Sequence, residues 1–182
     1  MVRELHPRWA LAILLGALAW PVWAEGLWER VGPGRIGATH AEIAEHLRLT
    51  CSANETGQVC SPAAGSADTF AGLPVRRVEL RFAQDRLARV TVRLSDREYD
   101  ALLDFLRMRF GESDDRSFRA RGGMASEFEA GVHLWQAGGV SLVLEQFAGK
   151  IDSSALTYGN QAAMADLVRS KTSYPRGSRR DL

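Results

Sequence analysis

The chain has 182 residues and an almost balanced charge, with 23 lysines and arginines against 22 aspartates and glutamates. This length provides one domain's worth of residues, enough for a single two-layer core. A balanced surface has no overall field that would attract nucleic acid or an anionic membrane, so we expect no nucleic-acid partner.

The first 24 residues have the three parts of a secretory signal peptide. Arg3 and Arg8 form a charged start, residues 9–20 form an apolar run, and a cleavage site follows Ala24. The apolar run is shorter than the roughly 20 residues with which a helix spans a bilayer, so a retained anchor is the weaker interpretation. No cysteine lies near the junction, where a bacterial lipoprotein would be acylated. We therefore predict export to the periplasm or the extracellular space, with no transmembrane segment after cleavage.

The two cysteines, Cys51 and Cys60, are predicted to form a disulfide because an exported protein meets an oxidising compartment. The segment between them is polar and contains Gly57, as suits a short closed loop. Closing so small a loop should stabilise the fold by about 2 rather than 4 kcal/mol. Redox-active cysteines usually form a Cys-x-x-Cys motif, and this longer spacing favours a structural role.

A short helix and a hairpin are the first elements that the mature sequence predicts. Thr39 and Glu42 fit a capping box before an amphipathic helix over about residues 41–49. Residues 75–82 and 87–94 then alternate apolar with charged or polar side chains. This alternation predicts two half-buried strands joined by a tight turn, with one face in water.

The strongest helix pattern follows the hairpin directly. Ser95 and Glu98 repeat the capping box, and Gly111 marks the end of a predicted helix over Ser95–Phe110. Its apolar face consists of Tyr99, Leu102, Leu103, Leu106 and Phe110. We expect this helix to be the main cover of the apolar side of the sheet.

The C-terminal half again has a strand pattern. Residues 127–135 and 140–144 alternate and predict a second hairpin, and residues 155–158 predict a third short strand. Asn160 fits the N-cap of a last short helix over 161–170.

These elements predict one α+β domain over residues 25–170. It would contain a single antiparallel sheet of about five strands, the long helix on one face, and short N- and C-terminal helices. Three polar stretches, at 32–38, 51–72 and 111–123, are predicted to be loops of that domain. Residues 171–182 are predicted to be a disordered basic tail, which solubilises the chain or makes weak contact with an anionic surface.

A candidate ligand site comprises Trp135, His133 and Glu129, which share one side of the predicted strand. An aromatic ring beside titratable groups on an exposed sheet face suits a small polar or sugar-like molecule. The favoured alternative is that Trp135 packs beneath a loop, such as the disulfide loop, while His133 is merely exposed.

Motifs for a metal, a cofactor or a nucleophile are not found in the sequence. Glu42 and His46 share a helix face, but one carboxylate and one imidazole make half a metal site at best. A Gly-x-Ser-x-Gly elbow does not occur, and the glycines of residues 32–37 lack the lysine of a phosphate-binding loop. We therefore expect no metal, no cofactor and no enzymatic activity.

Residues 72–158 resemble small exported proteobacterial proteins of unknown function. The resemblance is carried by GLPVRRVELRFAQDRLARVTVRL, a helix that ends in FG, HLWQAGGVSLVLEQF and LTY. The segment IGATHAEIAEHL, followed later by a hairpin, is similar to the helix-then-sheet units of the BamE-like outer-membrane assembly lipoproteins and of the β-lactamase-inhibitor-like fold. The resemblance implies a small helix-plus-sheet domain and no role for a particular residue. This chain departs from it by lacking the lipid-attachment cysteine and by placing a long helix between its hairpins.

The leading functional hypothesis is a non-enzymatic binding protein of the cell envelope, which holds a protein partner on an uncovered sheet face or a strand edge. The second hypothesis is a small-ligand carrier with a groove near Trp135 and His133. A hydrolase, assembled from polar residues that lie far apart in the sequence, is the third.

Overall fold

The computed structural model describes residues 26–54, 57–64, 69–121, 127–173 and 179–181. The predicted signal peptide lies outside these ranges. None of the helices within them has both the length and the apolar character needed to cross a membrane.

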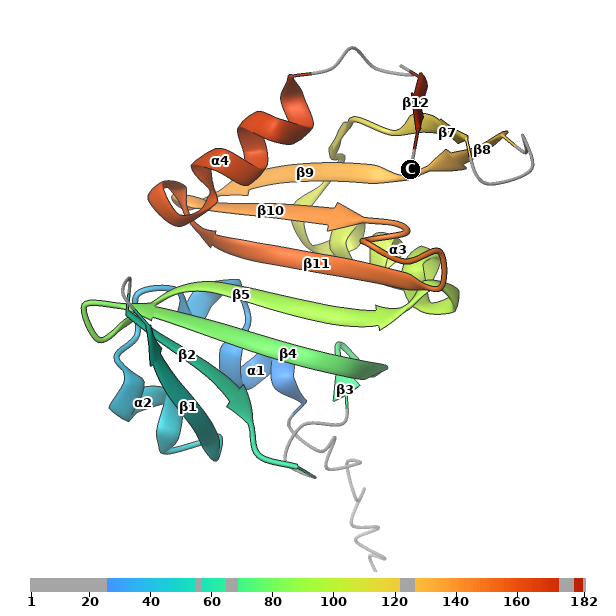
Figure 1. The fold of residues 1–182 in the computed structure, drawn as a ribbon. Helices are drawn as coiled ribbons and strands as arrows, with labels where there is room; N and C mark the ends of the chain where they lie inside the picture. Colours follow the sequence, from blue (N-terminus) through green and yellow to red (C-terminus); the bar gives the residue numbers. More distant parts are fainter. Residues whose placement is uncertain (1–25, 55–56, 65–68, 122–126, 174–178, 182) are drawn as a thin grey trace, which may run out of the picture.

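An antiparallel sheet of nine strands organises the fold (Figure 1). Its main path runs in the spatial order β1 (Leu49–Asn54), β2 (Gly57–Pro62), β4 (Leu73–Ala83), β5 (Arg86–Ser95), β11 (Ser153–Asn160), β10 (Val140–Glu145), β9 (Val132–Ala137) and β6 (Asp114–Asp115). The ninth strand, β3 (Thr69–Phe70), pairs with the start of β4. A second sheet consists of β12 (Arg179–Asp181), β7 (Phe118–Arg121) and β8 (Glu127–Ala130). The prediction of a single sheet of about five strands was therefore wrong.

Helices cover both faces of the large sheet (Figure 1). One face carries α1 (Leu27–Val31), the 3₁₀ turn η1 (Pro33–Arg35), α2 (His40–Ala44), the 3₁₀ turn η2 (Asp96–Glu98) and α3 (Tyr99–Phe110). On the opposite face, α4 (Gln161–Thr172) and the second sheet cover the part formed by β9 and β10. The prediction that one long helix is the main cover of the sheet was thus also wrong, because α3 shares its face with the N-terminal segment.

Two apolar clusters lie on the two sides of the large sheet. The main core, beneath α1 to α3, includes Leu80, Val92, Leu102, Leu106 and Leu156. The smaller core, beneath α4 and the second sheet, consists of Phe118, Ala120, Ala130, Val132, Leu134, Val143 and Met164. Strand β9 lies between the two clusters, so its residues from Val132 to Trp135 are all buried.

Both predicted hairpins form. In the first, Val78, Leu80 and Phe82 of β4 enter the main core, while the alternating charged residues face the other way. Gln84 and Asp85 have positive φ angles of 50° and 60°, as the tight turn between β4 and β5 requires. The second hairpin, β9 and β10, turns through Gly138 and Gly139.

The predicted disulfide between Cys51 and Cys60 is confirmed, but the segment around it is not a loop. The two cysteines are direct cross-strand partners in the β1–β2 hairpin. Strand β2 in turn pairs with β4 through residues 58–60, so a sheet edge organises this polar segment. The stretch at 111–123 likewise contains β6 and β7. Sheet pairing, which lies outside the local pattern, decides both cases.

The predicted helix starts are confirmed in two of three places. Thr39 and Glu42 form the capping box of α2, although that helix is shorter than predicted. The side chain of Asn160 accepts a hydrogen bond of 2.9 Å from the Ala163 amide at the start of α4. Ser95 instead precedes the 3₁₀ turn η2, without a side-chain capping bond to the described residues, and α3 begins only after that turn. At the C-terminus, where we expected disorder from Lys171 onward, α4 runs to Thr172 and β12 pairs in parallel with β7.

Candidate functional site

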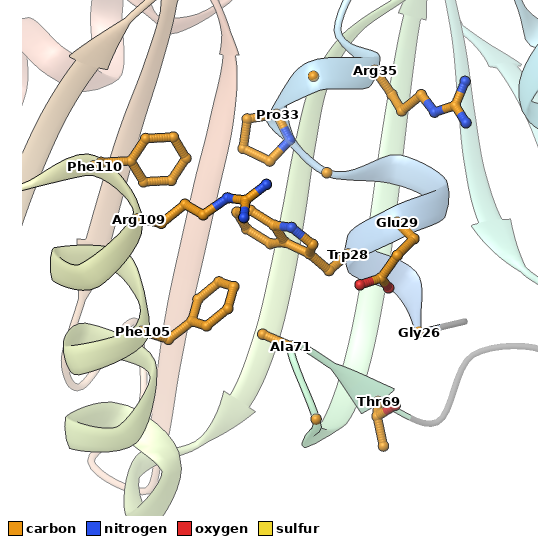
Figure 2. Close-up of a pocket in the computed structure, with 13 residues that line it drawn as sticks. Gly26, Trp28, Glu29, Pro33, Arg35, Thr69, Ala71, Phe105, Arg109 and Phe110 are labelled. Atoms are coloured by element: carbon orange, nitrogen blue, oxygen red, sulfur yellow. The ribbon is translucent and has the colours of Figure 1, made fainter. Parts of the chain in front are cut away.

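An open groove of about 750 Å³ lies between the N-terminal segment and α3 (Figure 2). We call it the Trp28 groove. It is lined by Gly26, Trp28, Glu29, Gly32, Pro33, Gly34, Arg35, Thr69, Ala71, Gly72, Phe105, Arg109 and Phe110. Its walls therefore come from α1, η1, the β3 region and the last turns of α3, which are far apart in the sequence but adjacent in the fold.

Trp28 is held in place by its neighbours on α1. Leu27 and Val31 are 1% and 0% exposed and anchor the short helix in the main core. The buried hydroxyl of Tyr158 on β11 donates a 2.8 Å hydrogen bond to the Val31 carbonyl. Gly32 then ends α1 in a close approach, because a Cβ atom there would collide with the Trp28 carbonyl. With its backbone fixed at both ends, Trp28 extends into the groove half-buried.

Aromatic rings surround the Trp28 indole. Phe70 and Phe105 lie edge-on to it, with ring centroids at 5.3 and 4.8 Å, and Phe110 is tilted at 6.2 Å. Such arrangements stabilise aromatic clusters beyond the area that they bury. Phe70 is fully buried, whereas Trp28, Phe105 and Phe110 keep part of their surface in the groove.

Arg109 supplies a positive charge at the centre of the groove. Figure 2 shows its side chain between Phe105 and Phe110, and its guanidinium carbon lies 5.9 Å from the Trp28 ring centroid. A cation over an indole face is stabilised by the ring quadrupole. Within the described part of the chain, no carboxylate forms an ion pair with Arg109. Arg109 is itself exposed, and Glu29 lines the same groove.

The residues of the predicted ligand site do not meet in a groove. Trp135 is 5% exposed, belongs to the main core, and donates a 2.9 Å hydrogen bond from its indole nitrogen to the Gly111 carbonyl. His133 lies beside it, with ring centroids 6.0 Å apart, and is equally buried. Glu129 is exposed on β8 of the second sheet, opposite Arg119. The two rings are thus brought together under α3, whereas Glu129 lies on another sheet.

His133 is held in a polar contact with the loop that follows α3. Its Nδ1 atom lies 2.8 Å from the Ser113 hydroxyl and 4.0 Å from a carboxylate oxygen of Asp115. A serine, a histidine and an aspartate are the members of a hydrolytic triad, but there the serine and the aspartate contact different ring nitrogens. Here Ser113 and Asp115 both contact the same ring nitrogen, Nδ1, so these three residues do not have the arrangement of a triad.

We expect the buried His133 to make the protein less stable in mild acid. Burial lowers the pKa of His133 below its ordinary value, although the charge of Asp115 opposes this effect. As the pH falls below about 6.5, His133 is protonated in the unfolded chain but not in the folded chain. The free energy of unfolding therefore falls with pH until the pH is below the folded-state pKa. The urea midpoint of unfolding should consequently drop between pH 7.5 and 5.5.

The variant His133→Gln should have a smaller drop in its urea midpoint over that pH interval. The control is His46→Gln, which changes an exposed histidine and should keep the wild-type pH dependence. An unchanged pH dependence in His133→Gln would show that another group is responsible.

One set of three possible metal ligands occurs among the described residues, namely His40, Cys51 and Cys60. The imidazole Nε2 of His40 lies 3.4 Å from the Cys51 sulfur. Both sulfurs are already bonded to each other, so they are not available as thiolate ligands.

No protein-family model, curated protein or solved structure matches this chain. The function therefore has to be inferred from the chain's own geometry.

Sequence reasoning missed Trp28 because its neighbours carry no motif. The spacing of Leu27 and Val31, four residues apart, could have indicated a short helix with one buried face. That spacing would place Trp28 outside the buried face of the helix, but it does not indicate which residues the indole contacts. Only the fold brings the last turn of α3 over it.

Proposed function

We propose that this chain is an exported binding protein and that the Trp28 groove holds its ligand. The ligand would combine an apolar or aromatic group with a negative charge. The observation that carries the proposal is the guanidinium of Arg109 above a half-exposed indole, in a groove of about 750 Å³. Binding sites for small molecules are mostly apolar concavities with a few placed polar groups, and this groove has that composition.

Export is supported by the predicted signal peptide and by the disulfide between Cys51 and Cys60. Disulfides persist in oxidising compartments such as the periplasm and the extracellular space, and are rare in the cytosol. The predicted mature chain would begin at Glu25, just before the residues that line the groove.

The groove can be tested with two dyes that differ in one charged group. The anion 8-anilinonaphthalene-1-sulfonate and its neutral counterpart N-phenyl-1-naphthylamine share the same aromatic body. We expect the anion to bind the mature chain at least about fivefold more tightly, since a charge-assisted contact contributes about 1 kcal/mol or more. Fluorescence titration measures both affinities.

Three variants separate the parts of the groove. Arg109→Gln should lower the affinity for the anionic dye and leave the affinity for the neutral dye unchanged, whereas Trp28→Ala should lower both affinities. Arg48→Gln, an exposed arginine that does not line the groove, should change neither affinity. If folded Trp28→Ala binds both dyes as the wild type does, the ligand site lies elsewhere.

A further inference from the structure

The sheet face opposite α1 to α3 carries a second concavity, independent of the Trp28 groove. Over β4 and most of β5 this face is open beside α4 in Figure 1, and α4 reaches β5 at Arg89. Four arginines line a cleft of about 460 Å³ there, and we call them the arginine face: Arg77, Arg81, Arg89 and Arg93. The rim of the cleft includes Glu145 and Leu167.

The register of the hairpin places these arginines opposite one another. Arg77 is the direct cross-strand partner of Arg93, and Arg81 is the partner of Arg89. Like charges in directly opposed positions destabilise a sheet. The β4–β5 hairpin thus contains two unfavourable pairs on one face, and such local conflicts are expected mainly where a function requires them.

The chain neutralises only a part of this charge. Arg81 binds Glu79 at 3.0 Å, and Glu145 is bound by Lys171. Arg93 donates a 3.1 Å hydrogen bond to the carbonyl of Ala148 instead of to a carboxylate.

Arg89 is the most constrained member of the arginine face. Its guanidinium is half-buried beside α4, where it donates a long hydrogen bond of 3.5 Å to the Ala163 carbonyl. Burial and the charge of Arg81 lower its pKa from the usual arginine value. No described residue gives Arg77, Arg89 or Arg93 an ion pair.

We propose that the arginine face binds an extended, acidic segment of a protein partner. The two arginine pairs are four residues apart along β4, which corresponds to about 13 Å in a strand. An extended peptide presents the side chains of residues i and i+4 on one side at the same spacing. Each pair of guanidinium groups would then receive one carboxylate, in the forked geometry that arginine prefers.

The position between the arginine pairs favours such a segment over a uniform polyanion. Glu79 and Thr91 oppose each other there, and Glu145 lies at the rim. A polymer with a negative charge at every unit would be repelled by these two carboxylates. A peptide with a basic or neutral residue at i+2 would avoid this repulsion, because that residue, and not a negative charge, would lie opposite Glu79.

The test uses fluorescein-labelled nine-residue peptides built from threonine and valine. The first carries two glutamates four residues apart with a lysine midway, and the second has glutamine in place of both glutamates. Fluorescence anisotropy at low salt should give an affinity at least about tenfold higher for the acidic peptide. This difference should shrink in 0.3 M salt, because exposed charges are then screened.

Variants locate the binding on the chain. The double variant Arg77→Gln/Arg93→Gln should weaken the acidic peptide at least about tenfold, with a thermal midpoint that is unchanged or slightly higher because a like-charge pair is removed. Arg48→Gln should leave the peptide affinity unchanged. Trp28→Ala should also leave it unchanged, so that failure of this proposal and failure of the Trp28 groove can be distinguished.

Two results would overturn the proposal. One is equal affinity of the wild-type chain for the acidic and the glutamine peptide. This result does not depend on whether any variant folds. The other is binding of inorganic polyphosphate that the double variant abolishes while neither peptide binds, since that would identify a different class of partner.

Discussion

Replacing both cysteines with alanine should lower the free energy of unfolding by about 2–3 kcal/mol, because the unfolded chain regains the entropy of a short open loop. In the folded chain the disulfide joins direct partners of β1 and β2. Among the described strands, β1 is the end strand of the large sheet and pairs with β2 alone. Loss of the disulfide should therefore also speed amide hydrogen exchange in β1. Urea denaturation and exchange mass spectrometry measure the two effects.

The control for this prediction is the wild-type chain reduced with a phosphine. It should unfold at nearly the same urea concentration as the Cys51→Ala/Cys60→Ala variant, since Cys60 is buried among apolar residues and alanine suits that site. An oxidised and a reduced wild type with the same midpoint would mean that β1 and β2 are held entirely by sheet pairing.

Gly131→Ala should destabilise the fold by about 1–3 kcal/mol, the usual cost of overpacking a core site. Gly131 is buried between β8 and β9, where the chain passes from the second sheet to the large one. A Cβ atom at this position would collide with the hydroxyl of Tyr99 on α3. Either α3 or the β8–β9 junction must then shift, and urea denaturation would report the cost.

The collision can be relieved in part from the other side, because Tyr99→Phe removes the nearest atom, although the ring carbon Cζ would still lie 2.6 Å from the added Cβ. The Tyr99 hydroxyl is buried and has no hydrogen-bond partner among the described residues, so Tyr99→Phe should by itself be nearly neutral. Combined with Gly131→Ala it should restore part of the lost stability. Gly34→Ala is the matched control, because nothing lies within 4 Å of a Cβ atom there. Strict additivity of the two substitutions would argue against the contact.

The consequences for function follow from where these features lie. The β1–β2 hairpin flanks β4, which carries two members of the arginine face. Gly131 and Tyr99 lie at the start of α3, whose last turns supply Phe105, Arg109 and Phe110 to the Trp28 groove. Variants at these positions should therefore be checked for folding before any loss of binding is interpreted.

Features that depend on neighbours in the chain were predictable from the sequence. The β4–β5 hairpin, the capping of α2 by Thr39, the stop of α3 at Gly111 and the capping of α4 by Asn160 all follow from side chains a few residues apart. The pairing of Cys51 with Cys60 was also predictable, since the chain has no other cysteine.

The sheet faces could not be assigned in the same way. Alternation in 127–135 indicated that Val132 and Leu134 are buried and that His133 is exposed, and it left Trp135 either in a ligand groove or beneath a loop. In the fold these four residues are all buried, because α3 covers one side of β9 while α4 and the second sheet cover the other. A period of two distinguishes the two sides of a strand, but it does not say how many of them are covered.

The sequence by itself determined the local elements, the cross-link and a hairpin with a charged, wet face. Only the tertiary structure decided which residues form sites: the Trp28 groove joins segments that are distant in the sequence, and the register shifts in the β4–β5 hairpin decide which arginines stand opposite one another. Trp28 and Arg109 meet through the packing of α1 against α3, and Arg77 meets Arg93 through the register of β4 with β5. Local pattern fixes the direction of a side chain relative to its own element, whereas its surroundings depend on long-range packing that no short segment encodes.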